Sequence, residues 1–150
     1  MKLKRILYWS PPSLWTIFIF IVGSLNFNDE FDQGNFLKRL FFNLKKFFIA
    51  KEGIFYKIVA LNLDKIYHFL QYLILATLVF WAAKKDLKKS FSFNIRLTFL
   101  AVFLIGMFDE LHQIFLKNRG CSLFDLFANI SGVLLLYMIL KDRKMRTDGI

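Results

Sequence analysis

The segment LTFLAVFLIGMFDELHQIFLKNRGCSLFDLFANISGVLLLYMIL, residues 97–140, contains two apolar runs separated by a polar stretch. The runs cover residues 97–108 and 126–140, so each reaches the length of helix that crosses the hydrocarbon core of a bilayer, about 20 residues, only with the adjoining polar residues included. Yet Asp109 and Glu110 follow the first run directly, and Asp125 lies at the head of the second. Burying an acid in lipid costs several kcal/mol, so such residues normally face other helices. The segment therefore predicts two membrane-spanning helices that share a polar site.

The composition of the whole chain is typical of a membrane protein. Of its 150 residues, 57% are hydrophobic and 19% are aromatic, more than a soluble domain of this size can bury. The net charge is +10, and the positive residues form short clusters between apolar runs, as in loops that flank spans. Aromatics interleaved with arginines in a polar context are absent, so we expect no nucleic-acid partner. The single Cys121 excludes an internal disulfide and a cysteine-based metal cage.

Four apolar segments are long enough to cross a bilayer. The predicted spans are residues 12–27, 64–83, 97–116 and 122–140. Pro11 and Pro12 suit the start of the first helix, where the missing N–H groups have no helical partner in any case. The basic N-terminus and its apolar run also fit a signal peptide, but the small-residue cleavage pattern is poor, and we retain this helix as a span.

Residues 36–50 predict a helix of a different kind. With about 100° between successive residues, apolar side chains fall on one face and basic ones on the other. The apolar face comprises Phe36, Leu37, Leu40, Phe41, Leu44, Phe47 and Phe48, and the basic face Lys38, Arg39, Lys45 and Lys46. Such a helix either lies in the membrane interface or covers the end of a bundle. The expected fold is all-α: one domain over residues 1–150, a polytopic membrane helical bundle with four transmembrane helices and one amphipathic interfacial helix.

The distribution of lysine and arginine predicts the orientation of the chain in the membrane. Four spans place the N-terminus, the 84–96 loop and the 141–150 tail on one side, and these carry twelve of the 21 positive residues. Loops rich in lysine and arginine stay in the cytosol. We therefore expect both termini to be cytosolic and the loop at 116–123 to lie outside.

Each of the last three spans carries an acid followed four residues later by His, Gln or Asn. The pairs are Asp64 and His68, Asp109 and Gln113, and Asp125 and Asn129. This spacing places both side chains on one helix face, and Gln71 extends the first stripe. Because successive spans run in opposite directions, the polar groups reach one level, about 6–10 Å into the membrane at ~1.5 Å per residue. Arg119 lies in the loop above them, which predicts a shared polar pocket in the extracytoplasmic leaflet.

Several of these residues also fit a purely structural role. Asp64 suits the N-terminus of its helix, and the sequence SLFD at 122–125 fits a capping box. His68 fits a hydrogen-bonded interior histidine, and Gly132 predicts close helix packing. Asp109 and Glu110 are different, because they lie inside a span and no cap explains them.

The polar residues suit binding better than metal chemistry. Glu110 and His112 lie about 200° apart on a helix, so they point to different faces, and we predict no metal and no cofactor. Paired acids near His68 also suit acid–base catalysis, although no serine or cysteine nucleophile with a plausible base is evident. Carboxylates and amides together with Arg119 suit the binding of a polar head group.

Two blocks, DKIYHFLQYLILA (64–76) and DELHQIFLKNRGCSLFDLFANISGVLL (109–135), resemble the VanZ-like family of small polytopic membrane proteins. The family pattern is matched at Asp64, Lys65, His68, Phe69, Tyr72, Asp109, Glu110, Gln113, Arg119, Asp125, Asn129 and Gly132. The long basic region 28–63 departs from the family. The resemblance implies a multi-pass protein of the bacterial inner (cytoplasmic) membrane, and the founding member of the family is associated with resistance to the glycopeptide teicoplanin.

We therefore expect a non-enzymatic role in the cell envelope, with a pocket for a membrane lipid, a lipid-linked cell-wall precursor or a glycopeptide. The predicted pocket residues are Asp64, Lys65, His68, Gln71, Tyr72, Asp109, Glu110, Gln113, Arg119, Asp125 and Asn129. Two alternatives stay open. One is an intramembrane hydrolase or transferase acting on an envelope lipid, and the other is a structural or assembly role in which the polar groups only hold helices together.

Overall fold

The computed structural model describes residues 2–24, 36–51, 53, 54, 58, 59, 62–116 and 121–148. Its helices are α1 (Lys2–Gly23), α2 (Phe36–Ala50), α4 (Leu63–Leu87), α5 (Phe91–Ile114) and α6 (Leu123–Asp148). All of these except α2 are long and apolar enough to cross a membrane. The predicted all-α bundle with four potential spans is confirmed.

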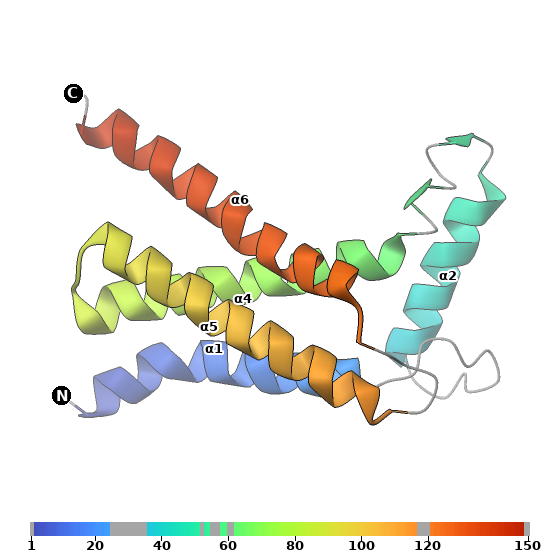
Figure 1. Cartoon of the computed structure of the whole chain (residues 1–150), viewed down its shortest axis with the longest axis horizontal. Coiled ribbons are helices and arrows are strands. Elements are labelled where there is room, and N and C mark those ends of the chain that lie inside the picture. The colour runs from blue at the N-terminus through green and yellow to red at the C-terminus, as the bar shows by residue number, and fades with distance from the viewer. Residues whose placement is uncertain are drawn as a thin grey trace.

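Helix α4 is the central helix of the bundle. It packs against α1, α5 and α6, and α5 also packs against α1 and α6. The apolar core contains Leu75 and Val79 from α4, Val102 from α5 and Val133 from α6. Figure 1 shows both chain termini at one end of the bundle. The beginnings of α4 and α6 lie at the opposite end with the end of α5, so the polar residues on these segments approach one another.

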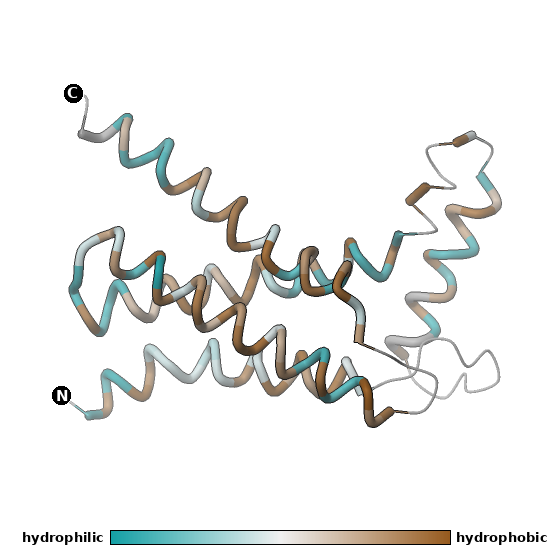
Figure 2. Tube along the Cα trace, in the orientation of Figure 1, coloured by the Kyte–Doolittle hydropathy of each residue, from teal (hydrophilic) through white to brown (hydrophobic). Residues whose placement is uncertain are grey.

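The outward-facing side chains of the long helices are largely apolar. Leu100 is 54% exposed, Ile114 is 52% exposed and Phe127 is 66% exposed. Figure 2 shows hydrophobic residues along much of α5 and α6 and hydrophilic residues in the last turns of α6. Exposing so continuous an apolar surface to water would cost free energy, whereas lipid solvates it.

Helix α1 begins ten residues before the predicted span, and Pro11 and Pro12 lie inside it. A proline inside a helix leaves the carbonyl four residues earlier without its usual N–H donor. Here the Ser10 hydroxyl donates to the Leu7 carbonyl at 3.3 Å and so replaces the donor that Pro11 lacks. Serine hydroxyls commonly restore such bonds in membrane helices. Residues 25–27 of the predicted span lie outside the described residues.

The other long helices differ from the predicted spans mainly by extending further at their cytosol-predicted ends, the start of α5 and the ends of α4 and α6. Helix α5 begins at Phe91, six residues before the predicted span, because Ser90 caps it: the Phe93 N–H donates to Ser90 Oγ at 3.3 Å. Helix α4 ends where Lys88 adopts a left-handed conformation, with φ of 51°. The apolar run thus predicts the part of a helix that lies in lipid, whereas the caps set its length.

Among the described residues, helix α2 packs on no long helix as closely as the long helices pack on one another. Its apolar residues Phe36, Leu40 and Phe47 are 70%, 46% and 55% exposed. In Figure 1 it crosses the direction of the bundle at the end opposite the termini, and Figure 2 shows alternating hydrophobic and hydrophilic residues along it. This placement favours the interfacial helix over a helix that covers the bundle end.

Candidate functional site

Buried polar side chains gather at the end of the bundle opposite the termini. We use the name polar cluster for His68, Tyr72, Asp109, Glu110, Gln113, Asp125 and Asn129, all less than 9% exposed. They come from α4, α5 and α6. Buried carboxylates and amides at this density normally satisfy one another or bind a ligand.

Asp109 lies at the centre of the first part of the cluster. The Tyr72 hydroxyl and the Gln113 amide nitrogen both donate to its Oδ2, each at 3.3 Å. Helix α1 lies against the other oxygen of Asp109, since a Cβ atom added to Gly23 would lie 2.8 Å from Asp109 Oδ1. Gly23 therefore has a positioning role that the sequence did not suggest, because nothing in a single sequence says which α1 residue faces Asp109.

Glu110 binds the start of the next helix. The Ser122 N–H donates to Glu110 Oε2 at 2.8 Å, and the Asp125 N–H donates to Ser122 Oγ at 3.3 Å. The predicted capping box is thus half present: Ser122 caps α6, but a carboxylate from α5 takes the place of Asp125. A carboxylate suits this position because the free N–H groups make a helix start electropositive.

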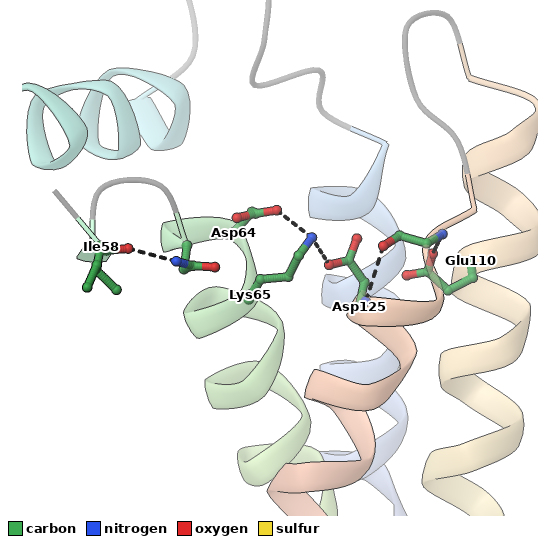
Figure 3. A network of polar contacts seen from close by, with 7 residues as sticks. Ile58, Asp64, Lys65, Glu110 and Asp125 are labelled. Carbon is green, nitrogen blue, oxygen red and sulfur yellow. Dashed lines mark hydrogen bonds and ion pairs between the residues drawn. The ribbon is translucent and has the colours of Figure 1, made fainter.

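Asp125 pairs instead with α4. Lys65 Nζ donates to Asp125 Oδ1 and also to Asp64 Oδ2, the latter at 2.8 Å. Figure 3 shows Lys65 between the two carboxylates, with Glu110 on the far side of Asp125. The Asp125 side chain is 12% exposed, the Lys65 side chain 33% and the Asp64 side chain 51%. Lys65 and Asp64 therefore form the rim of the polar cluster, outside its buried part.

His68 and Asn129 carry buried polar atoms that have no hydrogen-bond partner. The His68 ring stacks against Tyr72 with centroids 6.5 Å apart, and its Nδ1 is buried without a hydrogen-bond partner. Both polar atoms of the Asn129 amide are likewise buried and unpartnered, and so is Glu110 Oε1. A buried polar atom without a partner costs about 1–3 kcal/mol, so these atoms make the polar cluster a candidate binding site.

Gln71, another predicted pocket residue, makes its contacts outside the polar cluster. Gln71 is buried, but its amide donates to the Tyr67 hydroxyl, and its backbone carbonyl accepts from Trp15 Nε1 at 3.0 Å. It thus joins α4 to α1. His112 contacts the Phe20 ring on α1, with centroids 5.8 Å apart, and does not join the polar cluster. Arg119 lies outside the described residues, so its predicted position above the pocket stays a prediction.

A separate groove of about 730 Å³ lies between the start of α5 and the end of α6. Phe91 and Tyr137 line it together with Arg96, Lys141 and Lys144. It is at the same end of the bundle as the chain termini and holds none of the predicted pocket residues. Its basic lining agrees with the positive charge that the sequence places on that side.

The family model described as VanZ/LLP1 matches residues 11–144, which include every residue of the polar cluster. A comparison with curated proteins and one with solved structures gave no significant match.

Proposed function

The chain belongs to the VanZ/LLP1 family, and four of its described helices are able to span a membrane. We propose that it is a multi-pass protein of the bacterial inner membrane whose polar cluster binds a polar head group. The ligand class is a lipid-linked or cell-wall-related molecule, and the associated phenotype is resistance to a glycopeptide such as teicoplanin. The termini lie in the cytosol and the polar cluster in the outer leaflet.

One observation carries this proposal: unpartnered hydrogen-bonding atoms converge in a buried place at one end of the bundle. The Asn129 amide offers donors and an acceptor, His68 offers Nδ1, and Glu110 offers Oε1. Head groups of envelope lipids carry hydroxyl and phosphate oxygens, which such groups bind with directional hydrogen bonds. Lys65 lies on the rim of the polar cluster, where it pairs with Asp64 and Asp125.

The first test compares two buried asparagines. In a teicoplanin-susceptible Gram-positive host, the wild-type protein is expected to raise the minimum inhibitory concentration, and Asn129→Ala and Glu110→Gln are expected to abolish the increase. Asn94→Ala is the matched control, because Asn94 is as buried as Asn129 but lies near the start of α5, away from the polar cluster. It should leave the phenotype unchanged at equal membrane abundance.

Mass spectrometry of the purified protein gives a second measurement, independent of the drug. The wild-type protein and Asn94→Ala should retain an envelope lipid that Asn129→Ala loses. Equal lipid retention and equal resistance in all variants would contradict the head-group pocket.

The orientation has its own test. Cys121 is the sole cysteine of the chain, and it is exposed at the start of the segment that leads into α6. We expect a membrane-impermeant maleimide to label it in intact cells, with no increase after permeabilisation. Labelling that requires permeabilisation would place the polar cluster on the cytosolic side instead.

An intramembrane hydrolase or transferase is the second candidate. The observation that favours it is the proximity of a buried histidine to two buried acids, since a ring nitrogen of His68 lies within 4.8 Å of carboxylate oxygens of Asp109 and Glu110. Paired groups of this kind perform general acid–base chemistry. Turnover of an envelope lipid by purified protein, lost in Glu110→Gln, would decide for it.

A further inference from the structure

We propose that His68, Asp109 and Glu110 bind a divalent transition-metal cation of the zinc type. One nitrogen of His68 and one oxygen of each carboxylate lie within 4.8 Å of one another, and all three residues are buried. The inference goes beyond the head-group pocket and stands without it, although both proposals use His68 and Glu110.

The geometry lies close to that of a metal site. In four-coordinate zinc sites with bonds of about 2.0–2.2 Å, ligand atoms lie roughly 3.3–3.6 Å apart. Small side-chain rotations at His68 and Glu110 would close the remaining difference, because neither His68 Nδ1 nor Glu110 Oε1 has a hydrogen bond to give up. Three protein ligands would leave a fourth position for water or for an oxygen of a bound molecule.

Neighbouring groups hold the two carboxylates in place. Tyr72 and Gln113 donate to Asp109 Oδ2, and the Ser122 N–H donates to Glu110 Oε2. Each carboxylate thus has one oxygen fixed by the protein, as is usual for metal-binding carboxylates. The cluster therefore has the ligands and also the groups that orient them.

The charge balance favours a dication. The polar cluster contains three buried acids, Asp109, Glu110 and Asp125. Among the described residues, Lys65 is the lysine that reaches them, from the rim. Ionised acids repel one another strongly in a medium of low dielectric constant. Because Lys65 also bonds Asp64, it leaves these acids with excess negative charge, which a dication would offset.

The donor types select the class of metal. One imidazole nitrogen with two carboxylate oxygens suits Zn²⁺ and related transition metals, whereas Ca²⁺ and Mg²⁺ prefer oxygen ligands alone. The sequence expectation of no metal considered Glu110 with His112 on the same helix. In the structure the nitrogen comes instead from His68 on α4, which only the packing of α4 against α5 brings to the acids.

The test uses the full-length protein, purified in detergent with a tag that contains no histidine and stripped with a chelator. Titration with Zn²⁺ followed by calorimetry should give about one equivalent bound per chain and a higher unfolding temperature. His68→Ala and Glu110→Gln should weaken binding at least about tenfold, a typical effect of disturbing a metal site. His112→Ala is the matched control, because His112 lies outside the polar cluster, and it should bind zinc like the wild type.

Two outcomes would overturn the site. One is a wild-type protein that binds no zinc and gains no thermal stability from it, a result that needs no variant to fold. The other is His68→Ala binding zinc as tightly as the wild type. Substitution with Co²⁺ adds a spectroscopic measurement, since its visible absorption bands should appear in the wild type and in His112→Ala. These experiments use no antibiotic and no lipid ligand, so their failure would leave the head-group pocket standing.

Discussion

Replacing Gly132 with alanine is expected to destabilise the bundle by about 1–3 kcal/mol, the usual cost of overpacking. A Cβ atom at this position would lie 2.7 Å from the Leu73 nitrogen and 3.0 Å from the Phe69 carbonyl oxygen. Both are backbone atoms of α4, so no rotamer change can remove the clash. Helices α4 and α6 would have to move apart, which would also separate the two halves of the polar cluster.

Gly106→Ala is the matched control. A Cβ atom there would meet side chains, with Asn129 Nδ2 at 3.1 Å and Tyr72 Cε1 at 3.4 Å. Side chains can shift by a few tenths of an ångström, so we expect a smaller loss. Unfolding temperature and denaturant unfolding in detergent measure both variants. A Gly132→Ala protein as stable as the wild type would show that the α4–α6 contact is looser than the structure has it.

Lys65→Met is expected to have the second-largest effect on stability. It would leave the Asp125 carboxylate, with only 12% of its side chain exposed, without its cation. Breaking a fully buried ion pair costs about 3–5 kcal/mol, but Lys65 is one-third exposed and solvent reduces that figure. We expect a loss of about 1–3 kcal/mol.

A double-mutant cycle isolates the contribution of this pair. Asp125→Asn removes the charge that Lys65→Met leaves unpaired, so the double variant should be more stable than Lys65→Met alone. Asp64→Asn is the control, because Asp64 bonds the same lysine from a position with a 51% exposed side chain. It should change stability by at most about 1 kcal/mol. Additive effects of Lys65→Met and Asp125→Asn would argue against the pair.

The helix ends show where sequence reasoning stops. Apolar runs of sufficient length predicted all four long helices, because lipid requires continuous hydrophobic helix whatever its neighbours are. They did not predict that α1 continues through Pro11 and Pro12, because hydropathy does not show that the Ser10 hydroxyl bonds the Leu7 carbonyl, which Pro11 leaves without its N–H donor. A helix boundary depends on single hydrogen bonds, and these do not appear in a pattern of hydropathy.

For the polar residues too, the sequence predicted one part of the arrangement and the packing of the helices determined the other. The sequence by itself determined that Asp109 and Gln113 face one side of α5, and that Asp125 and Asn129 face one side of α6, because helical periodicity is a local property. The tertiary structure alone decided the partners. Glu110 caps α6 in place of Asp125, and Asp125 bonds Lys65. These hydrogen-bond partners depend on how the packed helices are rotated and how far apart they lie. Contacts between residues far apart in the chain determine both.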